Sequence, residues 1–301
     1  MVFAVFALVM VGLSWSLTGI VMSDAPRKKC DPALLLMASG VVSCAISLTL
    51  CLSLQKELLP WKVILLTGGC YFLAAVINYC MLQIMAHVMQ KGPNGVIWSI
   101  IQSGLVFPFL AGVIFYDSTL TWGRISGLSL ILFSLACLGL GKENKEKEKG
   151  WKLLTLLCFL LAGLIQTLNS LPSYYPQARM INSMGRTCFS AAGTLFAAFC
   201  VCFFRYRHCP LGEILAELKR PLLWKYVLSL QAFSLICSYL LLYPGLDAMA
   251  KAGAGSISYP LVVGACIVGF NLYSLFFLKE KWNVLQAAGV AFCIGGGVLL
   301  V

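Results

Sequence analysis

The chain has 301 residues, of which 60% are hydrophobic and 11% charged, and its mean hydropathy is +0.90. A water-soluble domain cannot bury that much apolar surface in one core, so the composition indicates an integral membrane protein. The net charge of +11 does not indicate a nucleic-acid partner, because the basic residues are spread over the predicted loops and form no patch interleaved with aromatic residues.

Apolar runs recur along the whole sequence, each close to the length of about 20 residues that a helix needs to cross a bilayer core. The alternation typical of an outer-membrane barrel is absent from the sequence, so these runs are expected to be helices. The sequence therefore predicts an all-α integral membrane protein with ten transmembrane helices. The predicted spans are Val2–Met22, Ala33–Leu54, Lys62–Met85, Pro93–Phe115, Gly123–Gly141, Lys152–Pro172, Met180–Phe204, Leu222–Tyr243, Ser256–Leu278 and Val284–Val301.

The fourth and ninth predicted spans both begin with residues that weaken a helix, such as glycine and proline. The two stretches are KGPNGVIWSIIQSG (Lys91–Gly104) and KAGAGSISYPLVVG (Lys251–Gly264). Glycine allows close helix approach and lets a helix end pivot, so these starts would suit gates on the two sides of the membrane. The alternative is ordinary turn chemistry before a helix, and the sequence does not decide between the two.

The dense charge run KENKEKEKG, residues 142–150, separates the first five spans (residues 1–141) from the last five (residues 151–301). This run is either a hinge or simply a solvated loop. The two halves resemble each other most clearly in FYDSTLTWGRISG (Phe115–Gly127) and FLKEKWNVLQAAG (Phe277–Gly289). Because five is odd, the second half would cross the membrane in the opposite direction, which predicts two inverted five-helix repeats of the kind found in secondary transporters.

Charge and cysteine positions predict the topology. Of the 22 basic residues, 16 fall in the odd-numbered loops, so the positive-inside rule places residues 142–150 in the cytoplasm and both termini outside the cell (inner) membrane. Most of the 14 cysteines fall inside apolar spans, where they act as small hydrophobes, and no disulfide is expected.

Polar and aromatic side chains form stripes at helical spacing, and these are the candidates for a substrate cavity. On the fourth span, Asn94, Trp98 and Gln102 share one face, and similar stripes converge on spans 1, 3, 4, 6, 8 and 9. For each residue the alternative is a bond to a neighbouring helix or a place in the interfacial aromatic belt. The predicted substrate-binding residues are Trp15, Tyr79, Gln83, Asn94, Trp98, Gln102, Gln166, Asn169, Arg186, Ser238 and Tyr259.

Ionisable residues are nearly absent from the predicted spans. All 11 acidic residues map to loops or span ends, so no carboxylate is predicted to carry a coupling ion at the midplane. His87 is the candidate for proton coupling, against a hydrogen-bonded histidine at a helix end. Arg186 either attracts a substrate anion or extends to the membrane interface.

The ten short spans, the stretch GPNGVIWSIIQSGLVFPFLAG and the closing SISYPLVVGACIVGFNLYSLFFLKEKWNVLQAAGVAFCIGGGVLL resemble the drug/metabolite transporter superfamily over nearly the whole chain. With both termini predicted outside, the topology resembles that of the rhamnose and glucose importers, a branch of this superfamily. The resemblance implies an alternating-access carrier and does not fix a substrate.

The expected function is secondary transport of a small polar metabolite, neutral or zwitterionic, by a monomer or homodimer in the lipid bilayer, with no cofactor, metal or nucleic acid. One alternative is an exporter of amphiphilic drugs. An integral-membrane enzyme is the other, although two histidines and no cluster of acids provide poorly for catalysis.

Overall fold

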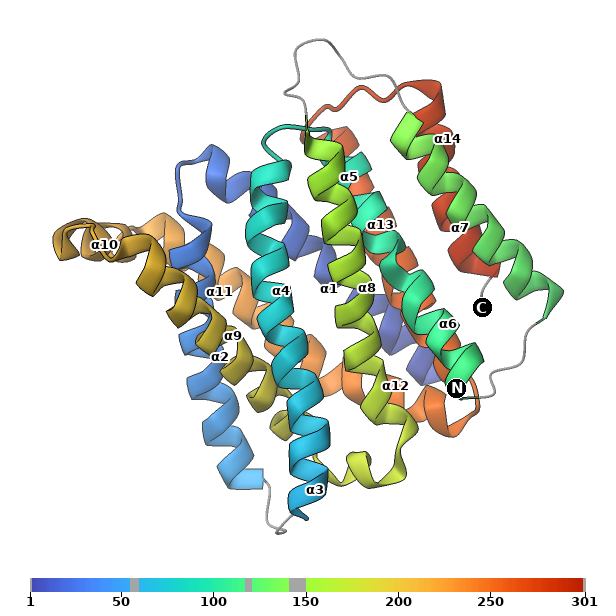
Figure 1. The fold of residues 1–301 in the computed structure, drawn as a ribbon, viewed down its shortest axis with the longest axis horizontal. Coiled ribbons are helices and arrows are strands. Elements are labelled where there is room, and N and C mark those ends of the chain that lie inside the picture. The colour runs from blue at the N-terminus through green and yellow to red at the C-terminus, as the bar shows by residue number, and fades with distance from the viewer. Residues whose placement is uncertain (1, 55–59, 117–120, 141–149, 300–301) are drawn as a thin grey trace.

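The computed structural model describes residues 2–54, 60–116, 121–140 and 150–299, and every regular element within these ranges is helical. Figure 1 shows the helices gathered into one bundle. Short π-helical or 3₁₀ segments link α3 to α4, α5 to α6 and α11 to α12. The helices are α1 (Val2–Arg27), α2 (Pro32–Leu54), α3 (Trp61–Val63), α4 (Gly69–Val88), α5 (Asn94–Gln102), α6 (Val106–Phe115), α7 (Trp122–Leu140), α8 (Trp151–Tyr174), α9 (Ser183–Tyr206), α10 (Leu211–Leu218), α11 (Pro221–Ile236), α12 (Tyr243–Lys251), α13 (Ser258–Phe276) and α14 (Val284–Leu299).

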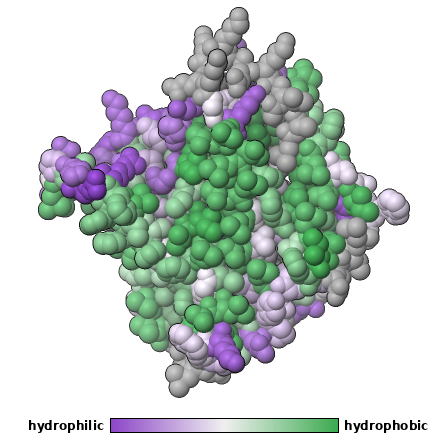
Figure 2. All heavy atoms as spheres, in the orientation of Figure 1, coloured by the Kyte–Doolittle hydropathy of each residue, from purple (hydrophilic) through white to green (hydrophobic). Residues whose placement is uncertain are grey.

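Seven helical stretches in the described residues are long and apolar enough to cross a membrane. Many of their large apolar side chains face outward, as a lipid solvent permits. In Figure 2 hydrophobic residues cover the middle of the visible face, and hydrophilic residues gather toward its ends. The protein is therefore an all-helical, membrane-embedded chain. Over the residues that the structure describes, all ten predicted runs lie mainly on helices.

The two halves of the chain are packed into each other. α1 packs most extensively on α13, α2 on α9 and α7 on α14, while α4 lies against both α8 and α9. Each of these contacts joins a helix from before the charged linker to one from after it. The linker itself, 142–150, lies outside the described residues except for Gly150.

Helix ends differ from the sequence prediction in one important place. The predicted eighth span ends at Tyr243, but the helix continues through a π-helical turn (Cys237–Leu242) and α12 to Lys251. Asp247, expected in a loop, is therefore on a helix. The sequence gives no clear signal for this, because YPGLDAMAK combines a proline and a glycine that would ordinarily end a helix.

The glycines at the start of the fourth and ninth spans have local structural roles. A Cβ at Gly95 would lie 2.6 Å from Asn271 Oδ1 and 2.8 Å from Ser274 Oγ, so only glycine fits there without displacement. Gly253 has a φ of 71°, a left-handed conformation that favours glycine after a helix end. Close packing and turn geometry account for both glycines, and their role as gates stays a prediction.

Candidate functional site

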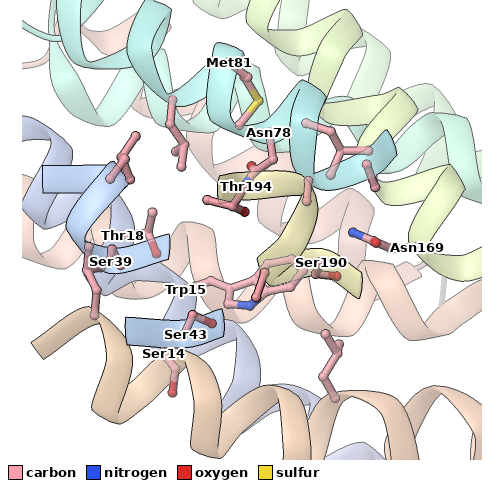
Figure 3. A pocket seen from close by; sticks show the side chains of 18 of the residues that line it. Ser14, Trp15, Thr18, Ser39, Ser43, Asn78, Met81, Asn169, Ser190 and Thr194 are labelled. Carbon is pink, nitrogen blue, oxygen red and sulfur yellow. The ribbon is translucent and has the colours of Figure 1, made fainter. Parts of the chain in front are cut away.

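A cavity of about 280 Å³ lies within the bundle, lined by α1, α2, α4, α5, α8, α9, α11 and the start of α12. Figure 3 shows Trp15 among the hydroxyl and amide side chains of this cavity. Trp98 supplies a second indole. The hydroxyl and amide residues of the lining are Ser14, Thr18, Ser39, Ser43, Asn78, Gln102, Gln166, Asn169, Thr187, Ser190, Thr194 and Gln231. Within this lining there is no Asp, Glu, His, Lys, Arg or Cys, so the cavity is polar but uncharged.

Helical periodicity explains how these side chains come to face one space. On α9, Thr187, Ser190 and Thr194 are spaced i, i+3 and i+7, which places them on one face. On α2, Ser39 and Ser43 follow the same rule. The small residues Gly40 on α2 and Ala191 on α9 also line the cavity beside these hydroxyls.

Three buried glutamines carry an unpartnered oxygen at the cavity. Gln102, Gln166 and Gln231 are at most 8% exposed, and the Oε1 atom of each has no hydrogen-bond partner in the described part of the chain. Gln231 also donates through Nε2 to Ser39 Oγ. Buried polar atoms are normally paired, because an unpaired one costs about 1–3 kcal/mol. Such acceptors indicate a solute or water that brings hydrogen-bond donors into the cavity.

Five predicted site residues line the cavity together: Trp15, Trp98, Gln102, Gln166 and Asn169. A sixth, Tyr259, is buried behind the wall, with its ring centre 6.3 Å from that of Trp15. The predicted spans 2 and 7 (α2 and α9) line the cavity, although no stripe on them was predicted to do so. Span 9 (α13) was predicted to line it and contributes no lining residue.

The predicted stripe on α4 is on the wrong face. Tyr79 is buried and donates through its hydroxyl to the Ala33 carbonyl at 3.2 Å. Gln83 is half-buried away from the lining, and His87 is exposed near the end of the helix. The residue that reaches the cavity is Asn78, one position before Tyr79 and therefore about 100° around the helix. The side chain of Ser238 lies outside the described residues.

Asn94 is hydrogen-bonded to a segment that is distant in sequence. Glu280, in the turn between α13 and α14, accepts hydrogen bonds from Asn94 N (2.7 Å), Asn94 Nδ2 (2.8 Å) and Gly95 N (3.0 Å), and from Ser274 Oγ (2.6 Å). Asn94 Oδ1 in turn accepts from Ser23 Oγ. A carboxylate at a helix N-terminus satisfies free backbone N–H groups. Burial raises the pKa of Glu280, but these hydrogen bonds outweigh it and hold the pKa below its usual value.

Arg186 is paired inside the bundle. The side chain is 1% exposed and donates to both carboxylate oxygens of Asp247, at 3.0 and 2.9 Å, and to the Ile181 carbonyl at 3.1 Å. The guanidinium also lies 5.6 Å from the ring centre of Tyr243, a cavity residue. Arg186 is thus neither free to hold a substrate anion nor extended to the interface, and it links α9 to α12 beside the cavity.

Most of the cavity residues missed from sequence carried a usable signal. Ser39 and Ser43, and Thr187, Ser190 and Thr194, occupy helical stripes, but serine and threonine are common in membrane helices and often bond their own backbone. Asn78 has no polar residue three or four positions away, so no stripe marked it. Thr187 shows the ambiguity, because its hydroxyl donates to the Ser183 carbonyl and still borders the cavity. The stripes of larger amides and aromatics were easier to recognise.

No protein-family model matches the sequence, and no curated protein matches it. Solved structures do match: 26 chains are significantly similar. One of them, described only as the crystal structure of a protein, aligns with 97% of this chain and 95% of its own length, with a TM-score of 0.60 at 14% identity. At that identity the similarity shows a shared fold alone.

Proposed function

We propose that the protein is a secondary carrier that moves a small polar metabolite across the cell membrane by alternating access. The observation that carries the proposal is the uncharged cavity inside the bundle, lined by two indoles and a set of hydroxyls and amides contributed from both halves of the chain. A solute crossing a membrane protein needs a polar path through an apolar surround, and a purely structural bundle has no such need.

The packing pattern supports ten spans in two inverted repeats. If each span n of the first half corresponds to span n+5, the contact of α1 with α13 (spans 1 and 9) should recur between spans 6 and 4. The extensive packing of α8 on α5 and α6 is that contact. The contact of α4 with α8 (spans 3 and 6) likewise recurs as the contact of α11 and α12 with α1 (spans 8 and 1). The pairs α2–α9 (spans 2 and 7) and α7–α14 (spans 5 and 10) are each their own counterpart under this correspondence.

Size and lining favour a small neutral solute. Pockets for drug-sized ligands run from about 300 to 1,000 Å³, whereas this one is about 280 Å³ and carries hydroxyls and amides on a partly apolar wall. An exporter of amphiphilic drugs is therefore the weaker candidate. A fully charged substrate would leave its charge without a partner among the lining residues. An enzyme is also less well supported, since the lining offers no paired nucleophile and base.

The proposal is tested by ligand binding to the purified protein. A panel of small neutral and zwitterionic metabolites is screened by thermal shift, because a ligand of the folded state raises its melting temperature. For a compound that binds, Gln102→Leu should weaken affinity about 5- to 150-fold, from the loss of one hydrogen-bond partner worth about 1–3 kcal/mol. Leu105→Met, a change of similar volume outside the lining, should have little effect. Absence of binding across the panel, or equal losses in both variants, would count against the site.

A further inference from the structure

α10 is an eight-residue helix that joins two membrane spans but belongs to neither. It lies between the end of α9 at Tyr206 and the start of α11 at Pro221, and Figure 1 shows it projecting sideways from the bundle. Leu211, Ile214, Leu215 and Leu218 form one apolar face of α10. Leu211 and Leu215, one turn apart, are 70% and 45% exposed, while Ile214 and Leu218 on the same face are half-buried. An exposed leucine face on a helix at the end of two spans is suited to the boundary between headgroups and acyl chains.

Two of the cationic side chains near α10 form ion pairs within the protein. Arg205 pairs with Asp31 at 3.0 Å, and Arg220 pairs with Glu217 at 2.7 Å and donates to the Lys29 carbonyl. Glu217 also accepts from the Asp31 backbone N–H at 3.2 Å. These bonds fasten α10 to the turn between α1 and α2.

Three other cationic side chains near α10 form no such ion pair within the described residues. Arg207 just before α10, Lys219 at its end and Lys225 on α11 are all exposed, and their side chains have no ion-pair or hydrogen-bond partner within the described residues. Glu213 is the exposed acid among them. In Figure 2 the hydrophilic colour gathers over this projecting part of the molecule, beside the hydrophobic surface of the bundle.

We propose that α10 forms a binding site for an acidic phospholipid. The acyl chains pack on Leu211 and Leu215, and the exposed cations Arg207, Lys219 and Lys225 attract the anionic headgroup. Each cation near an anionic membrane surface strengthens binding, and apolar burial adds to this. Because α10 is bonded to Asp31 through Glu217, a bound lipid also stabilises the turn between α1 and α2.

The test uses the full-length protein in a neutral detergent, titrated with phosphatidylglycerol or phosphatidylcholine, with melting temperature as the readout. Phosphatidylglycerol should raise the melting temperature at lower mole fraction than phosphatidylcholine, and added salt should reduce the difference. The triple variant Arg207→Gln, Lys219→Gln, Lys225→Gln should weaken the apparent affinity for phosphatidylglycerol roughly 10- to 100-fold. Leu211→Ser with Leu215→Ser should weaken the response to both lipids.

A matched control removes exposed cations elsewhere, in Lys62→Gln with Lys251→Gln, and should leave the phosphatidylglycerol response unchanged. Inorganic phosphate and glycerol phosphate are titrated in parallel. Unchanged affinity in the triple variant, or an equal loss in the control, overturns the proposal. So does an equal stabilisation by the soluble phosphates, which would make the site one for a free anion.

Discussion

Glu280 fixes the start of a helix, α5, that is 186 residues away from it in sequence. Its carboxylate receives two backbone N–H groups, one amide and one hydroxyl, which is a full set of partners for a half-buried anion. The residue lies at one end of the bundle and connects the start of α5 with the turn before α14. Its ionised form is therefore part of the folded structure.

Glu280→Gln should lower the free energy of unfolding at pH 7 by about 1–3 kcal/mol, since charge-assisted hydrogen bonds are lost. The pKa of Glu280 is lowered in the fold, so its contribution is present above the unfolded value of 4.5 and is lost as the pH falls through the folded pKa. Melting curves of the parent and the variant should converge in acid. Glu213→Gln, at an exposed acid without a partner among the described residues, should follow the parent throughout. A difference that stays constant down to acid pH would contradict this role for the charge.

The Arg186–Asp247 pair is expected to behave as a buried ion pair whose members depend on each other. Arg186→Met leaves the Asp247 carboxylate unpaired and should cost about 3 kcal/mol, while the double change with Asp247→Leu should recover much of the loss. The measurement is a double-mutant cycle on unfolding in detergent. Lys28→Met removes the exposed partner of Asp24 and should cost about 0–1 kcal/mol. Additive losses at Arg186 and Asp247 would show that the two charges act independently.

The sequence predicted the residue types of the cavity better than their positions. Trp98 and Gln102 both line the cavity, because a stripe that starts at the helix end continues inward along one face. Their role in binding a substrate stays a prediction. Asn94 has the same spacing, but its side chain is held by Glu280, and no local pattern reports a partner so distant in sequence. On α4 the larger polar residues face away from the cavity: Tyr79 bonds the neighbouring backbone, and Asn78 is the polar residue of α4 that borders the cavity.

Helix packing depends on glycines at contact points between elements. A Cβ at Gly12 of α1 would lie 2.0 Å from the Val262 carbonyl oxygen of α13, a backbone atom that cannot move without displacing the helix. Gly264 on the same α13 has no other atom within 4 Å of such a Cβ. The close approach of these two helices therefore requires glycine at the first position and not at the second.

Gly12→Ala should destabilise the protein by about 1–3 kcal/mol through overpacking between α1 and α13. Gly264→Ala should be neutral or slightly stabilising, because alanine favours the helix by about 1 kcal/mol. Melting temperatures of both variants in the same detergent check the pair. Equal effects would mean that the change of helix propensity dominates and that the approach is less close than the structure shows.

Element prediction succeeded because membrane helices are signalled by long apolar runs. It failed where composition is locally ambiguous. YPGLDAMAK reads as a turn, yet α12 continues there after a π-helical segment, and the Arg186–Asp247 bond holds it against α9. An ion pair between residues this far apart in sequence cannot be predicted from local sequence patterns.

For the molecule as a whole, the proposed inverted repeat fixes which loops share a side of the membrane. The α9–α10 connection is in the seventh loop and the end of α12 is in the eighth, so the two should lie on opposite sides. The positive-inside rule assigns the seventh to the cytoplasm, and α10 carries Arg207 and Lys219 at its two ends. Gly212 and Lys251 are exposed reporter positions, and a side chain built at Gly212 meets no atom within 4 Å.

Single cysteines at these positions, Gly212→Cys and Lys251→Cys, are introduced with Cys209→Ser, because the native thiol at Cys209 is exposed near α10. An impermeant maleimide added to intact cells should label the Lys251→Cys protein above the parental background and should label Gly212→Cys only after permeabilisation. The opposite pattern would reverse the orientation and leave the repeat intact, since the two loops would still face different sides. Labelling of both positions from the same side would show that the predicted eighth span, the only one between them, does not cross the membrane. The second half would then lack a fifth span, and the proposed inverted repeat would fail.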